Sequence, residues 1–600
     1  MSLPELSTLL ELPPPPGSTA SGAGDVFVHN ADVAKTFQEI ADLLEIKGEN
    51  TFRVRAYRNA ARTIEGLASS VQTMIAEHQD LTELPCIGAD LAGKIGEIVA
   101  TGTCATREQL RHELPPALAT LLSIPGLGPK RVKLLYQQRN IGSLEQLAVA
   151  ARAGEIRTIR GFGPRAEQRI LDAVEAQLSK SARFRIGTAS ELAQSFTRYL
   201  KAGDAHAEVE PAGSLRRMQD TIGDLDIVAS SPRPAALLQR FVDFDGVAEV
   251  LSHGPTRASV LLRQGIQVDL RVVPASSFGS ALQYFTGSKA HNIAMRRLAQ
   301  ERDLKLNEYG LFSAARRVAG ETEADVFAAL GMPYIAPELR ENRGEIEAAL
   351  AGQLPQLVTL ADLRGDLHAH TKASDGKSSL REMALAAQRR GWSYLAITDH
   401  SRQLSIAHGL DSEAVDRQVA QIERINQELH GLTVLKGIEV DINEDGSLDL
   451  PDACLRQLDL VVGAVHSGFN LSRDRQTTRI LRAMDHPCFT LLAHPSGRLL
   501  LEREPFDIDM PRVIAHARQR GCFLELNAQP HRLDLSDSYC LAAKKGGVLV
   551  SVNSDAHSRV DFDDLRFGIG QARRGWLEKS DVLNTRGLDE LRTLLAATRL

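Results

Sequence analysis

Residues 213–228 read GSLRRMQDTIGDLDIV, and the two aspartates of this stretch determine how the chain is interpreted. In Asp224-Leu225-Asp226-Ile227-Val228 polar and apolar residues alternate, so both carboxylates project from one face of a predicted strand. A second predicted strand, residues 265–272, places Asp269 on the face opposite its apolar residues. If the strands are neighbours, three carboxylates surround a space suited to two Mg²⁺ ions about 4 Å apart.

The residues that precede this acidic pair supply groups that a triphosphate needs. An Asp-x-Asp pair alone is common on protein surfaces, but here it follows Gly-Ser-Leu-Arg-Arg at residues 213–217. Ser214 and the backbone near Gly213 can donate hydrogen bonds to a triphosphate, and Arg217 can neutralise its charge. Together the two features predict phosphoryl transfer.

Six apolar runs in the last third of the chain each end in a histidine or a carboxylate. Most are followed by an amphipathic helical pattern, which is typical of buried parallel strands. A barrel of such units gathers its functional groups at the C-terminal ends of its strands. We therefore expect convergence of His368, His370, Asp375, His400, Glu439, His466, His494, Asp555 and His557.

These nine side chains form a predicted metal cluster. A single histidine after an apolar run is usually a core or loop residue, but here a ligand type fills the same position in six strands. Imidazole and carboxylate ligands without thiolates suit zinc, manganese or iron, and nine of them can hold three ions. Such a cluster would generate hydroxide at neutral pH and hold a phosphate, which indicates phosphoester hydrolysis.

Three stretches of the front third share an apolar-x-Gly-x-Gly pattern or a near form of it: residues 84–90, 124–130 and 159–165. Glycine lets the backbone approach a ligand, and the helix that follows points free N–H groups at it, so each unit can hold a phosphate without reading a base. The first stretch lacks the leading glycine. The predicted DNA contacts are Gly88, Gly126, Gly128, Lys130, Gly161, Gly163 and Arg165.

Charge is segregated along the 600 residues, although the net charge is only −6. Residues 101–185 carry fourteen Lys and Arg against seven Asp and Glu, whereas the last third is rich in Asp, Glu and His. A basic stretch is often a solvated helix face, but three hairpins within or beside this one favour sequence-independent DNA binding.

Length and composition exclude several classes of protein. At roughly 150 residues per domain, the chain predicts about four domains. With 43% hydrophobic and 24% charged residues it is typical of a globular protein, and no run approaches the roughly 18 apolar residues of a membrane span. Six cysteines without a Cys-x-x-Cys pair argue against a disulfide framework and a thiolate zinc site. Residues 1–24 lack the features of a signal peptide, so we expect a flexible tail and a cytoplasmic protein.

The Gly-Ser-x-Arg-Arg and Asp-x-Asp motifs resemble the nucleotidyltransferase core of the family X DNA polymerases. The resemblance implies a catalytic triad of Asp224, Asp226 and Asp269 with two Mg²⁺ or Mn²⁺ ions, in which Asp269 helps to activate the primer 3′-hydroxyl. Lys289 departs from the mammalian pattern at a base-contacting position. The implied nucleotide-binding residues are Gly213, Ser214, Arg217, Gly223, Tyr284, Phe285, Gly287, Asn292 and Arg296.

Residues 55–61, the first hairpin and Lys94-Ile95-x-Glu97-Ile98 resemble the small N-terminal domain of the same family. In eukaryotic relatives this domain binds the 5′-phosphate of a gap, and a lysine at the Lys94 position forms a Schiff base with the abasic sugar. That chemistry needs a lysine with a lowered pKa. Asp90 stands where those relatives carry a second lysine. Two interpretations of Lys94 stay open: a lyase residue, or a phosphate contact or helix-face charge.

The last third resembles the polymerase and histidinol phosphatase (PHP) domain. The motifs are Asp-Leu-His-Ala-His-Thr at residues 366–371, Thr-Asp-His at 398–400 and Ser-Asp-Ala-His at 554–557. In bacterial family X polymerases, which the whole chain resembles, this domain removes nucleotides 3′ to 5′ with Mn²⁺ preferred, and it trims blocked 3′ ends or cuts at abasic sites. The resemblance implies up to three Mn²⁺ or Zn²⁺ ions.

We therefore predict a multidomain α and α/β chain. It combines helix-hairpin-helix N-terminal domains, an α+β nucleotidyltransferase palm, a small α/β terminal subdomain and a metal-binding (βα)7-type barrel. The predicted boundaries are a tail (1–24), a gap-binding domain (25–105), a helix-hairpin-helix subdomain (106–185), the palm (186–283), the small subdomain (284–336), a linker (337–361) and the PHP barrel (362–600).

The predicted function is gap filling in DNA repair, including base excision repair, by a monomeric, nucleoid-associated bacterial polymerase with a 3′–5′ exonuclease. Its expected partners are gapped or primer-template DNA and deoxynucleoside triphosphates, with no membrane partner. The alternatives are a DNA-end-binding nuclease or scaffold with little or no polymerase activity, and a PHP phosphomonoesterase.

Overall fold

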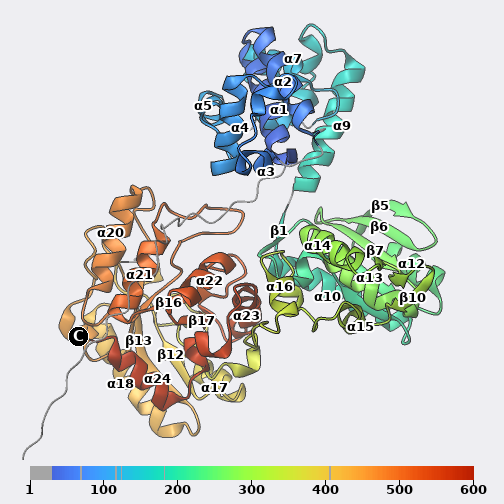
Figure 1. Cartoon of the computed structure of the whole chain (residues 1–600). Coiled ribbons are helices and arrows are strands. Elements are labelled where there is room, and N and C mark those ends of the chain that lie inside the picture. Colours follow the sequence, from blue (N-terminus) through green and yellow to red (C-terminus); the bar gives the residue numbers. More distant parts are fainter. Residues whose placement is uncertain are drawn as a thin grey trace, which may run out of the picture. The chain divides into compact units, whose positions relative to one another are not determined.

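The computed structural model describes residues 30–65, 67, 71–114, 118–122, 124–181, 183–403 and 407–599 (Figure 1). The predicted tail, residues 1–24, lies outside them. The chain forms two compact units, Met1–Lys180 and Ser181–Leu600. Among the described helices, none combines the length and the apolar character needed to cross a bilayer.

The first unit is helical and has two apolar cores. Phe37, Tyr57 and Ile95 lie in the first core, where the Phe37 and Tyr57 rings meet edge to face. Leu135 and Val174 lie in the second. The helices are α1 (Asn30–Lys47), α2 (Thr51–Glu65), α3 (Val71–Ala76), α4 (Ala89–Thr101), α5 (Ala105–Glu113), α6 (Leu118–Leu121), α7 (Pro129–Arg139), α8 (Leu144–Arg152) and α9 (Pro164–Ser181).

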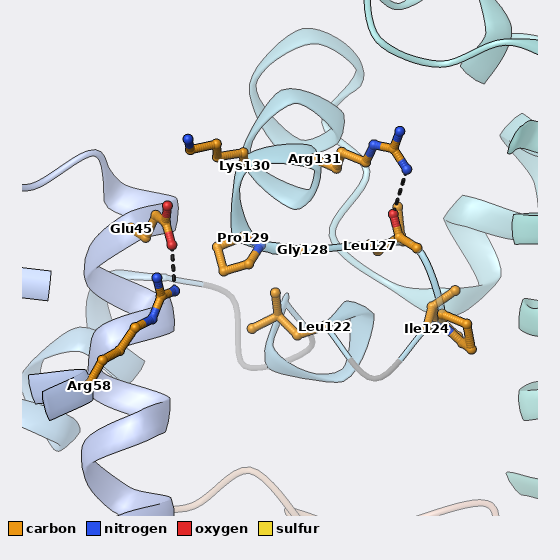
Figure 2. Close-up of a pocket in the computed structure, with 11 residues that line it drawn as sticks. Glu45, Arg58, Leu122, Ile124, Leu127, Gly128, Pro129, Lys130 and Arg131 are labelled. Carbon is orange, nitrogen blue, oxygen red and sulfur yellow. Dashed lines mark hydrogen bonds and ion pairs between the residues drawn. The ribbon is translucent and has the colours of Figure 1, made fainter. Parts of the chain in front are cut away.

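All three predicted hairpins form the same turn. In each, an apolar residue donates its backbone N–H to the carbonyl three residues earlier: Ile87 to Leu84 (3.1 Å), Leu127 to Ile124 (2.9 Å) and Phe162 to Ile159 (3.0 Å). The preceding residue is left-handed in every case, with φ of +64° at Cys86, +91° at Gly126 and +99° at Gly161. Cys86 therefore adopts the conformation that glycine adopts more readily, and the missing glycine does not change the turn. Figure 2 shows the second hairpin and the side chains around it.

The palm is a five-stranded sheet of order β2-β4-β7-β6-β5, in which β4 and β7 are parallel and the other pairs antiparallel. Apolar residues of α10 (Ile186–Gly203) and α12 (Pro234–Val242) share a core with one face of the sheet. The strands are β2 (Glu208–Pro211), β4 (Asp224–Ser230), β5 (Val247–His253), β6 (Arg257–Leu262) and β7 (Gln267–Val272); a short pair, β1 (Phe184–Arg185) and β3 (Thr221–Ile222), lies apart from them.

The small subdomain follows the palm and includes the segment expected to be a linker. Residues 337–361 contain η4 (Pro337–Leu339), α16 (Glu345–Leu350) and part of η5 (Leu360–Asp362), and Leu339 and Ile346 belong to the subdomain core with Met295 and Phe327. This segment is therefore packed structure. The other elements are α13 (Phe278–Thr286), α14 (Lys289–Gln300), β8 (Lys305–Asn307), β9 (Gly310–Ser313), β10 (Arg316–Ala319) and α15 (Glu323–Ala329).

The last part of the chain is a nearly closed parallel barrel, as predicted. Its seven strands pair in chain order from β11 to β17, and an Ala369–Ala556 bridge connects the two ends of the sheet. The strands are β11 (Gly365–Asp366), β12 (Tyr394–Ile397), β13 (Thr433–Asp441), β14 (Leu460–Ala464), β15 (Leu491–Leu492), β16 (Phe523–Asn527) and β17 (Val550–Asn553).

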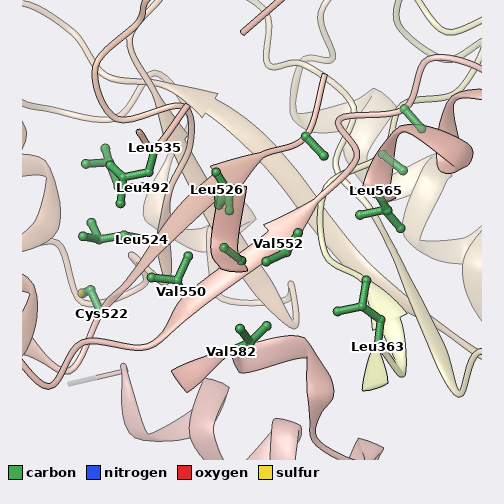
Figure 3. Packing of buried hydrophobic residues seen from close by; sticks show 14 of the residues in the cluster. Leu363, Leu492, Cys522, Leu524, Leu526, Leu535, Val550, Val552, Leu565 and Val582 are labelled. Atoms are coloured by element: carbon green, nitrogen blue, oxygen red, sulfur yellow. The ribbon is translucent and has the colours of Figure 1, made fainter. Parts of the chain in front are cut away.

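Helices follow most barrel strands and bury their apolar runs. Leu524, Leu526 and Val552 of β16 and β17 pack with Leu565 (Figure 3). The helices are α17 (Leu380–Arg389), α18 (Ser412–Glu428), α19 (Asp452–Leu455), α20 (Arg473–Met484), α21 (Met510–Arg520), α22 (Asp537–Lys545), α23 (Leu565–Arg574) and α24 (Leu588–Ala597). Because the strands are parallel, their carboxyl ends meet at one rim.

Two candidate metal centres and a phosphate-binding surface

The palm carboxylates come together because of the register of two strands. Asp226 of β4 and Asp269 of β7 are register partners on adjacent parallel strands. Leu225 and Ile227, which flank Asp226, lie in the core, so Asp224 and Asp226 share the opposite face. A cavity of about 140 Å³ is lined by Asp226 and Asp269 together with Arg257 and other residues. The predicted triad therefore forms one cluster.

Like charge and burial make this cluster a candidate cation site. Burial raises the pKa of Asp226 to about 7, and the neighbouring carboxylates of Asp224 and Asp269 add to the rise. Burial and Asp269 also raise the pKa of Asp224. A divalent cation would remove this repulsion.

Gly213 is fixed by its contact with the acidic cluster. Its φ is +60°, and a Cβ at this position would lie 2.2 Å from Oδ2 of Asp226. The next residues form the short helix α11 (Gly213–Arg216), on which Ser214 is half-buried. The glycine thus has a packing role that the sequence did not reveal, beside its expected role next to a triphosphate.

The two arginines of the motif differ in their contacts. Arg216 donates to both carboxylate oxygens of Glu323 (2.9 and 2.6 Å), so it links α11 to α15 of the small subdomain. Arg217 donates from Nε to Glu341 (3.0 Å) and from a terminal nitrogen to the Thr286 carbonyl (2.5 Å). Its charge partly opposes the rise in the Asp226 pKa, which places Arg217 beside the acidic cluster.

Some side chains of the predicted nucleotide pocket line the cavity, whereas others are hydrogen-bonded within the fold. The Phe285 ring lies 5.2 Å from that of Tyr284 and lines the acidic cavity. Asn292 is engaged within the fold, since its amide donates to the Tyr284 carbonyl (2.6 Å) and accepts from Gln283 (2.9 Å).

The remaining predicted pocket residues lie on the surrounding elements. Nε of Arg296 donates to the Asn292 carbonyl at 3.3 Å. Gly287 ends α13, and a Cβ there would lie 3.1 Å from Arg217. Gly223 separates β3 from β4, and Lys289 begins α14.

All nine predicted ligands of the barrel converge at the rim. Their ligand atoms form three overlapping groups: His370, Asp375, His400 and His557; His368, His370 and Asp555; and His400, Glu439 and His466. His494 completes the set, with Nε2 at 2.9 Å from Oε1 of Glu439. His370 and His400 each belong to two groups, so the three groups form one continuous cluster.

The imidazoles of the barrel cluster differ in protonation. Although burial opposes their charge, nearby carboxylates raise the pKa of His400 to about 10 and those of His466 and His557 to about 9, so a cation that binds there would displace protons. Burial and the neighbouring His400 and His557 lower the pKa of His370 to about 3, which keeps its imidazole neutral. Burial opposes a charge on Glu439, yet His400 and His368 hold the pKa of this carboxyl well below its usual value. Buried imidazole nitrogens of His368 and His370 make no hydrogen bond in the described part of the chain. A bound cation would satisfy them.

The hairpins of the first unit expose glycines at the protein surface. Gly126, Gly128 and Lys130 are exposed, and they line a cavity of about 680 Å³ with Arg58 and Arg131 (Figure 2). Apart from the adjoining chain, no atom of the described residues lies within 4 Å of the positions that a Cβ would take at Gly88, Gly128, Gly161 and Gly163.

Arg131 connects the second hairpin to the third. Its guanidinium donates to the carbonyls of Gly126 (2.8 Å) and Gly161 (3.2 Å) and lies over the Phe162 ring. Arg165, on the helix after the third hairpin, is exposed. Arg131 therefore ties the second hairpin to the third.

The surroundings of Lys94 do not favour the lyase interpretation. Burial opposes its charge, but the hydrogen bond to Asp90 and the electrostatic effect of Tyr57 outweigh it and raise the pKa of Lys94. A Schiff-base lysine needs the opposite shift. The acidic residue at position 90, noted in the sequence, is thus the partner that keeps Lys94 charged.

Similarity to known proteins decides the family. The chain is 36% identical over 575 residues to the DNA polymerase/3′-5′ exonuclease PolX of Bacillus subtilis (strain 168). The aligned residues are 95% of this chain and 99% of that protein. The chain belongs to the bacterial family X DNA polymerases with a PHP domain. The predicted family, fold class and enzyme class, a DNA polymerase with a 3′–5′ exonuclease, are thereby confirmed.

Partial matches agree with this family. Family models match residues 28–104 (helix-hairpin-helix domain), 118–176 (SAM-like helix-hairpin-helix tandem), 281–341 (DNA polymerase beta thumb) and 366–527 (PHP domain). Rat DNA polymerase lambda is 25% identical over 343 residues, which are 52% of this chain and 56% of that protein. A probable phosphatase of Caldanaerobacter subterraneus is 32% identical over 213 residues, 34% of this chain and 78% of that protein.

Carboxylates behind the PHP ligands were not recognised from the sequence. Oε1 of Glu525 lies 2.7 Å from Nδ1 of His368, and Oε2 of Glu525 accepts the His494 backbone N–H (2.7 Å). Oδ1 of Asp441 lies 3.0 Å from Nδ1 of His466. Such partners orient a ligating imidazole and fix its tautomer. The available signal was an acidic residue inside an apolar strand, as in Phe523–Asn527.

Gly213→Ala should abolish most nucleotide addition, because its Cβ would collide with the Asp226 carboxylate. We expect a loss of about a hundredfold in primer extension, the scale of a misplacement of about 1 Å at a reacting centre. Gly352→Ala is the matched control, since Gly352 has φ of +67° and no atom within 4 Å of its Cβ position. An equal loss in both variants would assign the effect to backbone strain instead.

Glu525→Gln should weaken metal binding at the barrel about 10- to 100-fold, because His368 would lose its charged hydrogen-bond partner. The measurement is the Mn²⁺ retained after dialysis against graded chelator. Glu423→Gln on the exposed side of α18 serves as control. Equal retention in the two variants would contradict the role of Glu525.

Proposed function

We propose that this polymerase fills short DNA gaps at the palm and trims 3′ ends at the PHP barrel. The observation that carries the proposal is the presence of two separate clusters of side chains of the types that ligate metals, one at the Asp226–Asp269 register pair and one at the barrel rim. Phosphodiester synthesis and hydrolysis both need cations against phosphate oxygens, but they need different nucleophiles. Two sites in one chain supply both.

At the palm, Asp224, Asp226 and Asp269 would hold two Mg²⁺ or Mn²⁺ ions. When bound, these ions supply Lewis-acid stabilisation of the attacking and leaving oxygens. Asp269 lies next to Asp226 and would accept the proton of the primer 3′-hydroxyl. Arg217, with Ser214 and the α11 backbone, would bind and orient the triphosphate. The Tyr284–Phe285 pair would face the sugar.

At the barrel, the nine converging side chains would hold up to three Mn²⁺ or Zn²⁺ ions. These ions, when bound, supply hydroxide at neutral pH and neutralise the scissile phosphate. His370 is neutral and ready to ligate, and Glu439 is ionised although it is buried. Glu525 and Asp441 would hold the His368 and His466 rings in place. This chemistry suits 3′–5′ exonuclease activity, 3′-end processing and cleavage at abasic sites.

The first unit would hold the DNA through its phosphates. Exposed hairpin glycines and Lys130 offer contacts without base readout. Lys94, whose pKa is raised by Asp90, fits a phosphate contact better than a lyase residue. The substrates would be gapped or primer-template DNA and deoxynucleoside triphosphates. We further propose a monomer that acts at the bacterial nucleoid in the cytoplasm.

Two other functions are less well supported. A scaffold without polymerase activity should have a broken triad, whereas Asp224, Asp226 and Asp269 form one cluster. A small-molecule phosphomonoesterase would use only the barrel, and the probable-phosphatase match covers 34% of this chain against 95% for PolX. A comparison of gapped DNA with histidinol phosphate as substrates would separate this activity from DNA processing.

Asp226→Ala should abolish nucleotide addition and leave trimming intact, because it removes a central metal ligand of the palm only. The assay is extension and degradation of a one-nucleotide-gap substrate with Mg²⁺ or Mn²⁺, with and without nucleotides. Asp245→Ala, at a fully exposed carboxylate of the palm, is the control and should retain both activities. Synthesis that survives in Asp226→Ala would refute the assignment.

His368→Ala combined with His370→Ala should do the reverse. The double variant loses ligands from two of the three barrel groups, so trimming should fall below detection while gap filling persists. The control pair is His430→Ala with His516→Ala, on the outside of the same barrel. Undiminished trimming in the first pair would discard the barrel as the nuclease.

A further inference from the structure

Arg574, the last residue of barrel helix α23, contacts residues both within the barrel and outside it. Its side chain is 3% exposed, and one terminal nitrogen donates both to Glu341 (2.8 Å) and to the backbone carbonyl of Arg217 (2.8 Å). The other terminal nitrogen donates to Asp537 (2.8 Å). A residue of the nuclease domain thus reaches the residue that we assign to triphosphate binding.

Glu341 is the shared acceptor between the two domains. One of its oxygens accepts from Nε of Arg217 (3.0 Å), from Gln219 (2.7 Å) and from Arg574 (2.8 Å). Burial opposes its charge, but Arg217 and Arg574 lower the pKa of Glu341, so the carboxylate is ionised. Glu341 and the Thr286 carbonyl together position the Arg217 guanidinium.

Charge balance at this contact depends on Arg574. The described cluster holds the guanidinium groups of Arg217, Arg343 and Arg574 against the carboxylates of Glu341 and Asp537. Its net charge is therefore positive. Without Arg574 the cluster would be neutral, and Glu341 would accept hydrogen bonds only from Arg217 and Gln219 among the described donors. Arg217 would then offer less charge to a triphosphate.

We propose that Arg574 is a positioning residue of the polymerase site, so that the PHP barrel sets the nucleotide affinity of the palm through Glu341 and Arg217. The inference rests on the proposed role of Arg217 in binding the triphosphate. Arg574 touches no reacting atom and acts only through these two residues. The nuclease domain is then a structural part of the nucleotide-binding site.

The same helix provides a matched control. Arg573 donates to Glu338 of η4 (2.8 Å) and to the Val358 carbonyl (3.2 Å), so it also joins α23 to the preceding segment. No contact of Arg573 with Arg217 or Glu341 occurs among the described residues. If α23 served only to hold the barrel against the preceding segment, substitutions of Arg573 and Arg574 would have the same effect on KM.

The test compares Arg574→Gln with Arg573→Gln in the full chain. Single-nucleotide insertion into a one-nucleotide gap gives KM for the nucleotide and kcat, and degradation without nucleotides reports the barrel. For Arg574→Gln we expect KM to rise about 10- to 100-fold, the range for a lost hydrogen bond between charged groups, with kcat and degradation within about twofold of the unsubstituted chain. Arg573→Gln should keep KM within about twofold. Equal KM rises in both variants would overturn the proposal.

Two further variants keep the test decisive if Arg574→Gln is poorly folded. Arg574→Lys keeps the charge but loses the fork that holds Glu341 and the Arg217 carbonyl together, and its KM should rise by less than that of Arg574→Gln. In an Arg217→Gln background, Arg574→Gln should add little to KM, because the two act as a unit. The proposal would be contradicted if the KM changes of Arg217→Gln and Arg574→Gln were fully additive. It would also be contradicted if Arg574→Gln lost both activities while Arg574→Lys kept an unchanged KM.

The controls separate this inference from the proposed function. A chain without substitutions that adds no nucleotide to the gap would refute the proposed function itself. A chain that adds nucleotide with the same KM with or without Arg574→Gln would refute only the role of Arg574.

Discussion

The burial of closely spaced carboxylates is the constraint on which both candidate sites depend. At the palm, three carboxylates meet on one face of two parallel strands, and burial together with their repulsion raises the pKa of Asp226 to about 7. At the barrel rim, ionised Glu439 and Asp555 are buried among imidazoles. The palm arrangement is unfavourable without cations, so the surrounding packing must hold its carboxylates in place, whereas the barrel carboxylates are stabilised by the imidazoles around them. The close contact of Gly213 with Asp226 serves this purpose at the palm.

The two sites differ in their ligands and folds, yet both can be predicted from the sequence. Parallel strand pairing explains why. The side-chain period of a strand placed Asp224 and Asp226 on one face, and the shared carboxyl rim of the barrel gathered ligands that are far apart in the chain. Both inferences need only local pattern and one topological rule. The hairpins were recognisable for a similar reason, because their turn is encoded by a few adjacent residues. Cys86 adopts that turn without the leading glycine.

What the sequence did not reveal depends on contacts between distant segments. Glu525 has no neighbouring motif, and only the fold brings it 2.7 Å from His368. Asn292 matched a family position, but the structure shows its amide engaged with Tyr284 and Gln283. The role of Asp90 could be suspected from its identity, but the raised pKa of Lys94 follows from geometry. The boundaries of the predicted domains remain predictions.

The packing of residues 337–361 affects how such an enzyme can be divided or recombined. Ile346 and Ala349 of α16 fill the core of the small subdomain, and Arg340 and Glu345 within the same stretch are completely buried. A polymerase fragment that ends before residue 337 would expose the apolar residues against which this stretch packs. A barrel fragment that begins within the stretch would expose the apolar residues of the stretch itself. Fusion partners joined here are therefore not exchangeable modules. A shuffled chimera would have to inherit the stretch together with the subdomain that it completes.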